Sequence, residues 1–131
     1  MFDKIISKYE DYFYFIFRIF VGLLFFQHGA QKLFGWFEKD PVALFSLLGL
    51  AGIIEFFGGI AIFFGLFTRF VALISAIEML VAYFYIHVPM GFIPIINKGE
   101  LALLYFAAFL VLFIKGSKKF SLEKRIFKRE F

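Results

Sequence analysis

The chain of 131 residues contains no cysteine, and charged residues make up only 18% of it. The absence of cysteine excludes a disulfide scaffold, a thiolate metal site and any thiol redox chemistry carried by this chain. An ordinary soluble domain is about a quarter charged and about half apolar. This chain is instead 63% hydrophobic, with 24 phenylalanines and a mean hydropathy of +0.90. Such a composition rules out both a soluble globular protein and a disordered chain.

Long apolar runs predict an all-α fold, because about 20 apolar residues in a helix span the hydrocarbon core of a bilayer. We expect one domain over residues 1–131, folded as a four-helix transmembrane bundle. Its membrane helices are predicted at 12–34, 43–67, 70–87 and 100–115. The fourth run is short, so the apolar stretch Gly91–Ile96 before it is expected to fold back over the bundle at membrane depth.

The two ends of the chain have a different character from the apolar body. In residues 1–11, apolar side chains recur at helical spacing between charged ones, which predicts a short interfacial helix on the membrane surface. From Lys115 onward there are seven Lys/Arg and two acids, so residues 116–131 are interpreted as a basic tail that meets anionic lipids. No basic groove or base-stacking platform accompanies this tail, and nucleic acid is not an expected partner.

The distribution of Lys and Arg predicts the orientation. An even number of passes places both termini on one side, together with Lys4, Lys8, Arg69 and the seven tail residues, which makes ten. The other side holds three: Lys32, Lys39 and Lys98. Both termini are therefore expected in the cytoplasm.

Several ionisable residues lie inside the predicted membrane helices, where an unpaired charge costs several kcal/mol. At 100° per residue, Arg18, His28 and Lys32 share one face of the first helix. Glu55 is surrounded by glycines, which allow another helix backbone to approach closely. The depths of these and other polar residues predict a ligand pocket open to the outer face. It would be built from His28, Gln31, Lys32, Glu55, Glu78, His87, Asn97 and Glu100.

Depth also predicts how the buried charges pair. Counted at 1.5 Å per residue from the cytoplasmic side, Arg18 lies closer in depth to Glu78 than to Glu55. We therefore expect a buried Arg18–Glu78 ion pair that leaves Glu55 free to meet a ligand. In a purely structural alternative, Arg18 pairs with either acid only to hold the helices in register.

The two histidines allow other interpretations as well. His28 can simply be solvated near the interface, and the same holds for His87. Together with Glu55 and Glu78 they are of a ligand type that binds zinc or iron, but no metal-binding spacing is present. We predict no metal site, and no catalytic residue is assigned.

Several runs of the sequence resemble the DoxX family in order along the chain. The most distinctive are Arg18–Phe37, Leu50–Gly59 with Gly65–Arg69, Ala76–Tyr83, His87–Phe92 and Asn97–Tyr105. The resemblance covers roughly Phe15 to Ser121; Asn97-Lys98-Gly99 departs from the usual Asn-Gly-Gly of the family. It implies a small multi-pass protein of the prokaryotic cytoplasmic (inner) membrane, and it carries over Arg18 and the pocket residues named above.

The resemblance leaves three functions open. Family members include a membrane subunit of a thiosulfate:quinone oxidoreductase and a subunit of a complex linked to thiol and superoxide stress, which implies a quinone-linked redox subunit. Such a protein would carry no intrinsic cofactor, would bind a quinone and would receive electrons from a partner subunit. The alternatives are a non-catalytic membrane adaptor or chaperone, and a small-solute or proton-coupled transporter. Assembly as a homo-oligomer is compatible with each of them.

Overall fold

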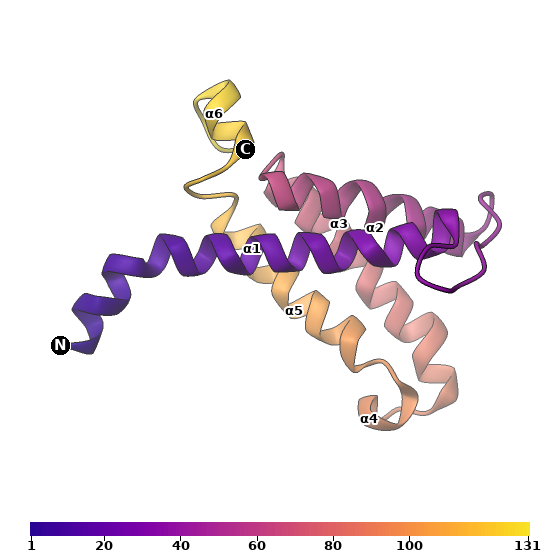
Figure 1. The fold of residues 1–131 in the computed structure, drawn as a ribbon. Helices are drawn as coiled ribbons and strands as arrows, with labels where there is room; N and C mark the ends of the chain where they lie inside the picture. The colour runs from indigo at the N-terminus through magenta and orange to yellow at the C-terminus, as the bar shows by residue number, and fades with distance from the viewer.

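The computed structural model describes residues 1–131, which fold into helices and loops without any strand (Figure 1). The α-helices are α1 (Phe2–Phe34), α2 (Leu47–Phe64), α3 (Thr68–Ala82), α4 (Pro94–Asn97), α5 (Glu100–Lys115) and α6 (Leu122–Phe127). A π-helix, η1 (Tyr83–His87), and a 3-10 helix, η2 (Val88–Met90), continue α3. The all-α prediction is confirmed.

Three helices are long and apolar enough to cross a membrane. They are Phe2–Phe34, Leu47–Phe64 and the continuous segment Thr68–Met90. The fourth predicted pass, 100–115, coincides with α5, which has 16 residues. The second begins four residues later than predicted because Ser46 caps α2, its hydroxyl accepting from the backbone N–H of Gly49 at 3.0 Å.

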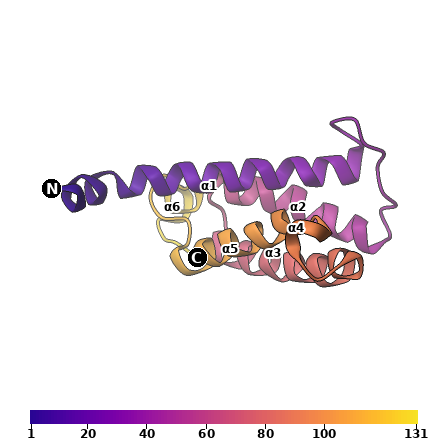
Figure 2. The ribbon, with the colours of Figure 1, turned by 90° about the horizontal axis from the view of Figure 1, so that it is seen from below.

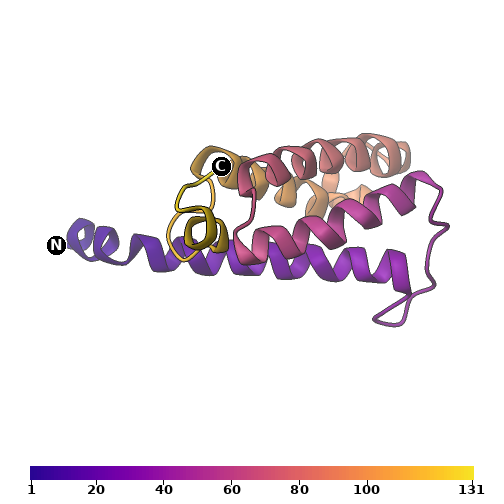
Figure 3. The same ribbon diagram turned by 90° about the horizontal axis from the view of Figure 1, so that it is seen from above.

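The N-terminal segment does not form the separate helix that the sequence pattern predicts. Residues 2–11 belong to α1, which runs unbroken for 33 residues. No glycine or proline occurs between Phe2 and Val21, so nothing in the local sequence interrupts the helix. The first part of α1 therefore extends beyond the other helices (Figures 2 and 3).

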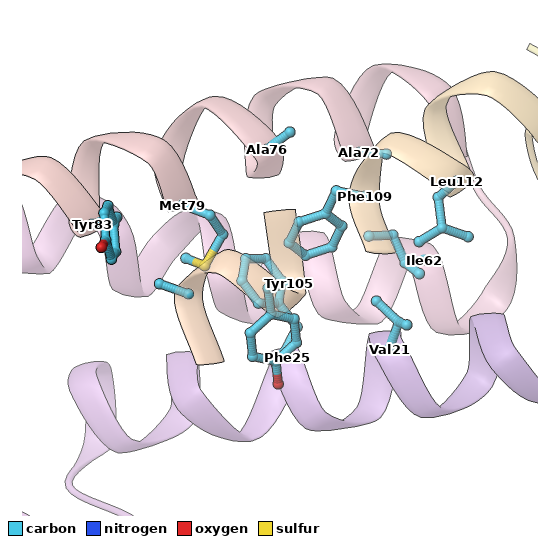
Figure 4. Packing of buried hydrophobic residues seen from close by; sticks show 11 residues of the cluster. Val21, Phe25, Ile62, Ala72, Ala76, Met79, Tyr83, Tyr105, Phe109 and Leu112 are labelled. Carbon is cyan, nitrogen blue, oxygen red and sulfur yellow. The ribbon is translucent and has the colours of Figure 1, made fainter. Parts of the chain in front are cut away.

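Side chains from α1, α2, α3 and α5 form one hydrophobic core (Figure 4). The rings of Phe25 of α1 and Phe109 of α5 meet edge-on, with 4.7 Å between ring centres, and Ile62 of α2 is fully buried beside them. Most other large apolar side chains face outward, among them Phe57 and Phe70, each more than 60% exposed. An apolar exterior around a small core is the arrangement expected of helices surrounded by lipid.

The closest helix contact is between α1 and α2, and glycines make it possible. A Cβ atom at Gly59 would lie 2.6 Å from the Cα of Phe26, and one at Gly29 would lie 2.6 Å from the Cα of Phe56. Only glycine allows two helix backbones to come this near. This contact fixes how α1 and α2 face each other along most of the length of α2.

The segment before α5 folds back onto the end of the π-helix. Asn97 is fully buried, and its amide donates to the Tyr83 hydroxyl at 3.2 Å and to the Gly91 carbonyl at 2.8 Å. The Tyr83 hydroxyl donates in turn to the carbonyl of Phe92 at 3.0 Å. The apolar side chains of Phe92 and Ile95 point away from this anchor and are largely exposed.

The α1–α2 contact yields a stability prediction. Gly59→Ala places a methyl group against the backbone of α1 and should destabilise the protein by about 1–3 kcal/mol, the usual cost of overpacking. Gly58→Ala is the matched control, because its methyl would meet a methyl group of the Val71 side chain at 3.3 Å rather than the backbone of another helix. Both variants gain the same helix propensity. Thermal unfolding in detergent should therefore show a clearly larger loss for Gly59→Ala, and equal losses would contradict the close contact.

Candidate functional site

A polar cavity of about 290 Å³ lies among α1, α2, α3, η1 and α5. Of the eight pocket residues predicted from the sequence, five line it: His28, Lys32, Glu55, Glu78 and His87. Its remaining polar lining residues are Lys39, Lys98 and Tyr105. The volume is just below the usual range of small-molecule sites, about 300–1,000 Å³.

Lys32 and Glu55 form the ion pair of this cavity. The Lys32 ammonium donates to Glu55 Oε2 at 2.7 Å, and the Glu55 side chain is only 6% exposed against 24% for Lys32. Lys32 lies in the last turn of α1, next to Gly29, where the two helix backbones meet. The ammonium keeps further N–H groups that can donate to a ligand.

Glu78 is the acid without a basic partner, and the nearest charged neighbours of its carboxyl group are Glu55 and Lys32 of the ion pair. Both of its carboxylate oxygens are buried, and neither has a hydrogen-bond partner. The prediction that Glu78 is paired and Glu55 free is therefore wrong, and their roles are exchanged. Glu55 meets Lys32 because the glycine contact brings α1 and α2 together, whereas Glu78 lies on α3, which does not share that contact.

Arg18 does not pair with Glu78, contrary to the depth prediction. Its guanidinium donates instead to backbone carbonyls of Ile62, Phe63, Ser117, Lys119 and Phe120, at distances between 2.6 and 3.4 Å. These carbonyls belong to the end of α2 and to the loop before α6. Glu78 is ten residues beyond the start of α3, about 15 Å along that helix at 1.5 Å per residue. The Arg18 guanidinium, which binds carbonyls at the end of α2, is too far away to reach it.

The histidines take different positions. The His28 ring packs edge-on against Tyr105 at 5.9 Å between ring centres. His87 has Nδ1 3.0 Å from the carbonyl oxygen of Asn97, so one nitrogen of its ring is engaged in holding the segment before α5. His28 is therefore the histidine with more freedom to contact a ligand.

Three predicted pocket residues lie outside the cavity. Gln31 faces the loop after α1, with its amide nitrogen 3.5 Å from the Phe37 carbonyl. Asn97 is a buried structural residue, and its Oδ1 accepts from the backbone N–H of Gly99 at 2.8 Å. Glu100, at the start of α5, is exposed. No group of three or more His, Asp or Glu side chains is arranged to hold a metal ion.

The residues that the sequence analysis missed come mainly from loops. Lys39 follows α1 and Lys98 ends α4, and neither belongs to a periodic pattern that could assign it to a face. Tyr105 lies one helical turn beyond Leu101 on α5, and both line the cavity, but neither differs in the sequence from the other apolar residues of that helix.

An apolar groove of about 280 Å³ between α2 and α3 joins this polar cavity. The two share five lining residues: Leu48, Ala51, Glu78, Ala82 and Ile86. Apart from Glu78 the groove is lined only by hydrophobic side chains. Glu78 thus lies where an apolar groove and a polar cavity meet.

These features define a small all-helical membrane protein with ionisable residues gathered in an internal cavity. The DoxX family profile matches residues 13–88, more than half of the chain, and the chain belongs to the DoxX family. The resemblance seen in the sequence motifs is thereby confirmed.

Two relatives illustrate the family. An uncharacterised protein of Haemophilus influenzae is 38% identical over 95% of this chain and 98% of its own length. A Bacillus subtilis protein named "Putative oxidoreductase CatD" is 28% identical over 85% of this chain and 84% of its own length. No solved structure matches the chain at a significant level.

The ion pair gives a double-mutant prediction. Lys32→Met strands a nearly buried carboxylate and should approach the lower end of the about 3–5 kcal/mol that breaking a buried pair costs. Glu55→Leu should cost less, because the partly exposed ammonium can reach water. The combined variant should recover much of the loss in a thermal or chemical unfolding experiment. Simple additivity of the two single effects would show that the pair is not coupled.

Proposed function

We propose that this protein is a quinone-binding membrane subunit of a redox complex in the prokaryotic cytoplasmic membrane. The observation that carries the proposal is the position of Glu78, whose unpartnered carboxyl group lies at the junction of a polar cavity and an apolar groove. A quinone has the matching shape, a polar ring with an apolar tail. The name of the Bacillus subtilis relative, an oxidoreductase, agrees with a redox role.

Each polar group of the cavity has a role in this proposal. Burying an unpaired carboxylate is costly, whereas a protonated carboxyl group is neutral and can donate to a quinone carbonyl. Glu78 would bind the carbonyl in this way and pass on one of the two protons that reduction to the quinol takes up, regaining a proton from water in the polar cavity. Lys32 and His28 would donate to the opposite side of the ring. The isoprenoid tail would lie in the groove between α2 and α3.

The electrons would come from a partner subunit. The reduction of a quinone to a quinol takes up protons and electrons in equal number, and this chain has no cysteine to supply electrons through thiol chemistry. Within the complex, this chain would therefore bind the quinone, exclude water from it and provide its proton path. A membrane adaptor that binds no small ligand is the outcome that the experiment below distinguishes.

The test uses the purified full chain and decylubiquinone, a quinone with a short apolar tail. Glu78→Leu should weaken binding about 5- to 150-fold, the effect of losing one hydrogen bond worth roughly 1–3 kcal/mol. It should not lower the melting temperature, because it removes an unpaired buried acid. Glu100→Leu is the matched control, since that acid is exposed outside the cavity and should leave affinity unchanged.

A second probe tests the groove. Menadione has a quinone ring without a tail, and it should bind more weakly than decylubiquinone to the unaltered protein. Calorimetric titration in detergent measures both affinities. Absence of quinone binding, or equal affinity in Glu78→Leu and the unaltered protein, would overturn the proposal in favour of an adaptor.

We also propose that α5 is a fourth membrane pass and that both termini are cytoplasmic. The division of the Lys and Arg residues between the two ends of the structure supports this topology. Lys39 and Lys98 both line the mouth of the polar cavity, whereas Lys115 and Lys119 lie near Glu10 and Asp11 of α1 at the other end, at 3.9 and 3.6 Å. The second end carries the larger share of Lys and Arg, as cytoplasmic surfaces do.

Cysteine labelling tests the topology on a background with no native cysteine. Asp40 and Arg129 are both exposed and lie at opposite ends of the predicted topology. A membrane-impermeant maleimide should label Asp40→Cys in intact cells, and Arg129→Cys only after the cells are opened. Labelling of both positions from outside would refute an even number of passes.

A further inference from the structure

A second cavity, of about 680 Å³, lies at the end of α2 away from the polar pocket, against the middle of α1. Arg18, which lines it, precedes Lys32 by fourteen residues, about 21 Å along α1. Its apolar wall comes from α1, the end of α2, the loop before α6 and the start of α6: Phe15, Ile19, Phe63, Phe64, Phe120 and Leu122. Figure 1 shows α6 set apart from α1, close to the connection between α2 and α3.

The charged lining of this cavity is entirely basic. It consists of Arg18, Lys124 and Arg125, and no acidic residue lines it. Arg18 is 1% exposed and forms no salt bridge; backbone carbonyls accept its hydrogen bonds, and the nearest acid that acts on its charge is Glu123, which does not line the cavity. Lys124 and Arg125 are exposed on α6. The cavity therefore attracts an anion whose other part is apolar.

Hydrogen bonds hold α6 in this position. The backbone N–H of Glu123 donates to the Gly65 carbonyl at 3.1 Å, and the Glu123 carboxylate accepts from the backbone N–H of Phe67 at 3.2 Å. Glu123 is fully buried and is not among the residues lining the cavity. The loop before α6 is bound by Arg18. The two cations of α6 thus line the same cavity as apolar side chains from the middle of α1 and the end of α2 before any ligand arrives.

We infer that this cavity binds one anionic phospholipid, which the topology proposed above places in the cytoplasmic leaflet. Its phosphate would contact Lys124 and Arg125, and an acyl chain would lie against Phe15, Ile19 and Phe64. Charge complementarity selects this occupant. The cavity is lined by several cations and no acid, which matches a ligand with a net negative charge, whereas a neutral quinone and a zwitterionic lipid carry no net charge. The inference is independent of quinone binding at the polar cavity.

The test compares two double variants of the same tail. Lys124→Gln with Arg125→Gln removes the two rim cations, and Lys128→Gln with Arg129→Gln removes two equivalent charges that do not line the cavity. Native mass spectrometry of the full chain in detergent, titrated with phosphatidylglycerol, measures lipid occupancy. The first pair should weaken binding about 30-fold, from about five-fold for each cation. The second pair should change it less than about two-fold.

Three further outcomes bear on the inference. Phosphatidylcholine should bind far more weakly than phosphatidylglycerol, and glycerol phosphate, which has the headgroup but no acyl chains, should not compete. An equal loss in both double variants would mean that the tail attracts anionic lipids without a defined site. Unchanged binding in the first pair, or competition by glycerol phosphate, would also overturn the inference.

Discussion

The close approach of α1 and α2 is the contact on which the arrangement of charges depends. Gly29 and Gly59 let the two backbones meet, and this sets Lys32 of α1 against Glu55 of α2 at 2.7 Å. Because that ammonium is engaged with Glu55, Glu78 on the neighbouring helix is left without a partner. A packing constraint on small residues therefore decides which of two intramembrane acids is available for chemistry.

The structure accommodates its buried charges in three different ways. Lys32 and Glu55 neutralise each other, whereas Arg18 is surrounded by carbonyl oxygens that tie the loop before α6 to the end of α2. Glu78 has neither kind of partner. In a low-dielectric surrounding the first two arrangements offset the cost of burying a charge, and the third is costly unless a proton or a ligand satisfies the group. That difference separates structural charges from a functional candidate.

Both proposed ligands are amphiphiles, and the surroundings explain why. Each site has apolar lining from the helices and a group of polar side chains at one end. This combination matches a bilayer molecule that has an apolar tail and a polar head group. The polar cavity offers Lys32, His28 and an unpaired acid, which suits the carbonyl groups of a neutral ring. The cavity near α6 offers only cations, including Lys124, which suits a phosphate. As proposed, the two sites would select different head groups while sharing the bilayer as their source of ligand.

Composition and periodicity by themselves determined the all-helical membrane fold and the 100–115 helix, sequence motifs indicated the family, and helix face and depth identified five of the residues lining the polar cavity. These follow from local chemistry, since a long apolar run must form a helix in lipid. The tertiary structure alone decided that Glu55 rather than Glu78 is paired, that Arg18 binds carbonyls, and that Lys39 joins the cavity. Depth along each helix can be counted from the sequence. Which helices touch, and how each is turned, depends on packing between segments far apart in the chain.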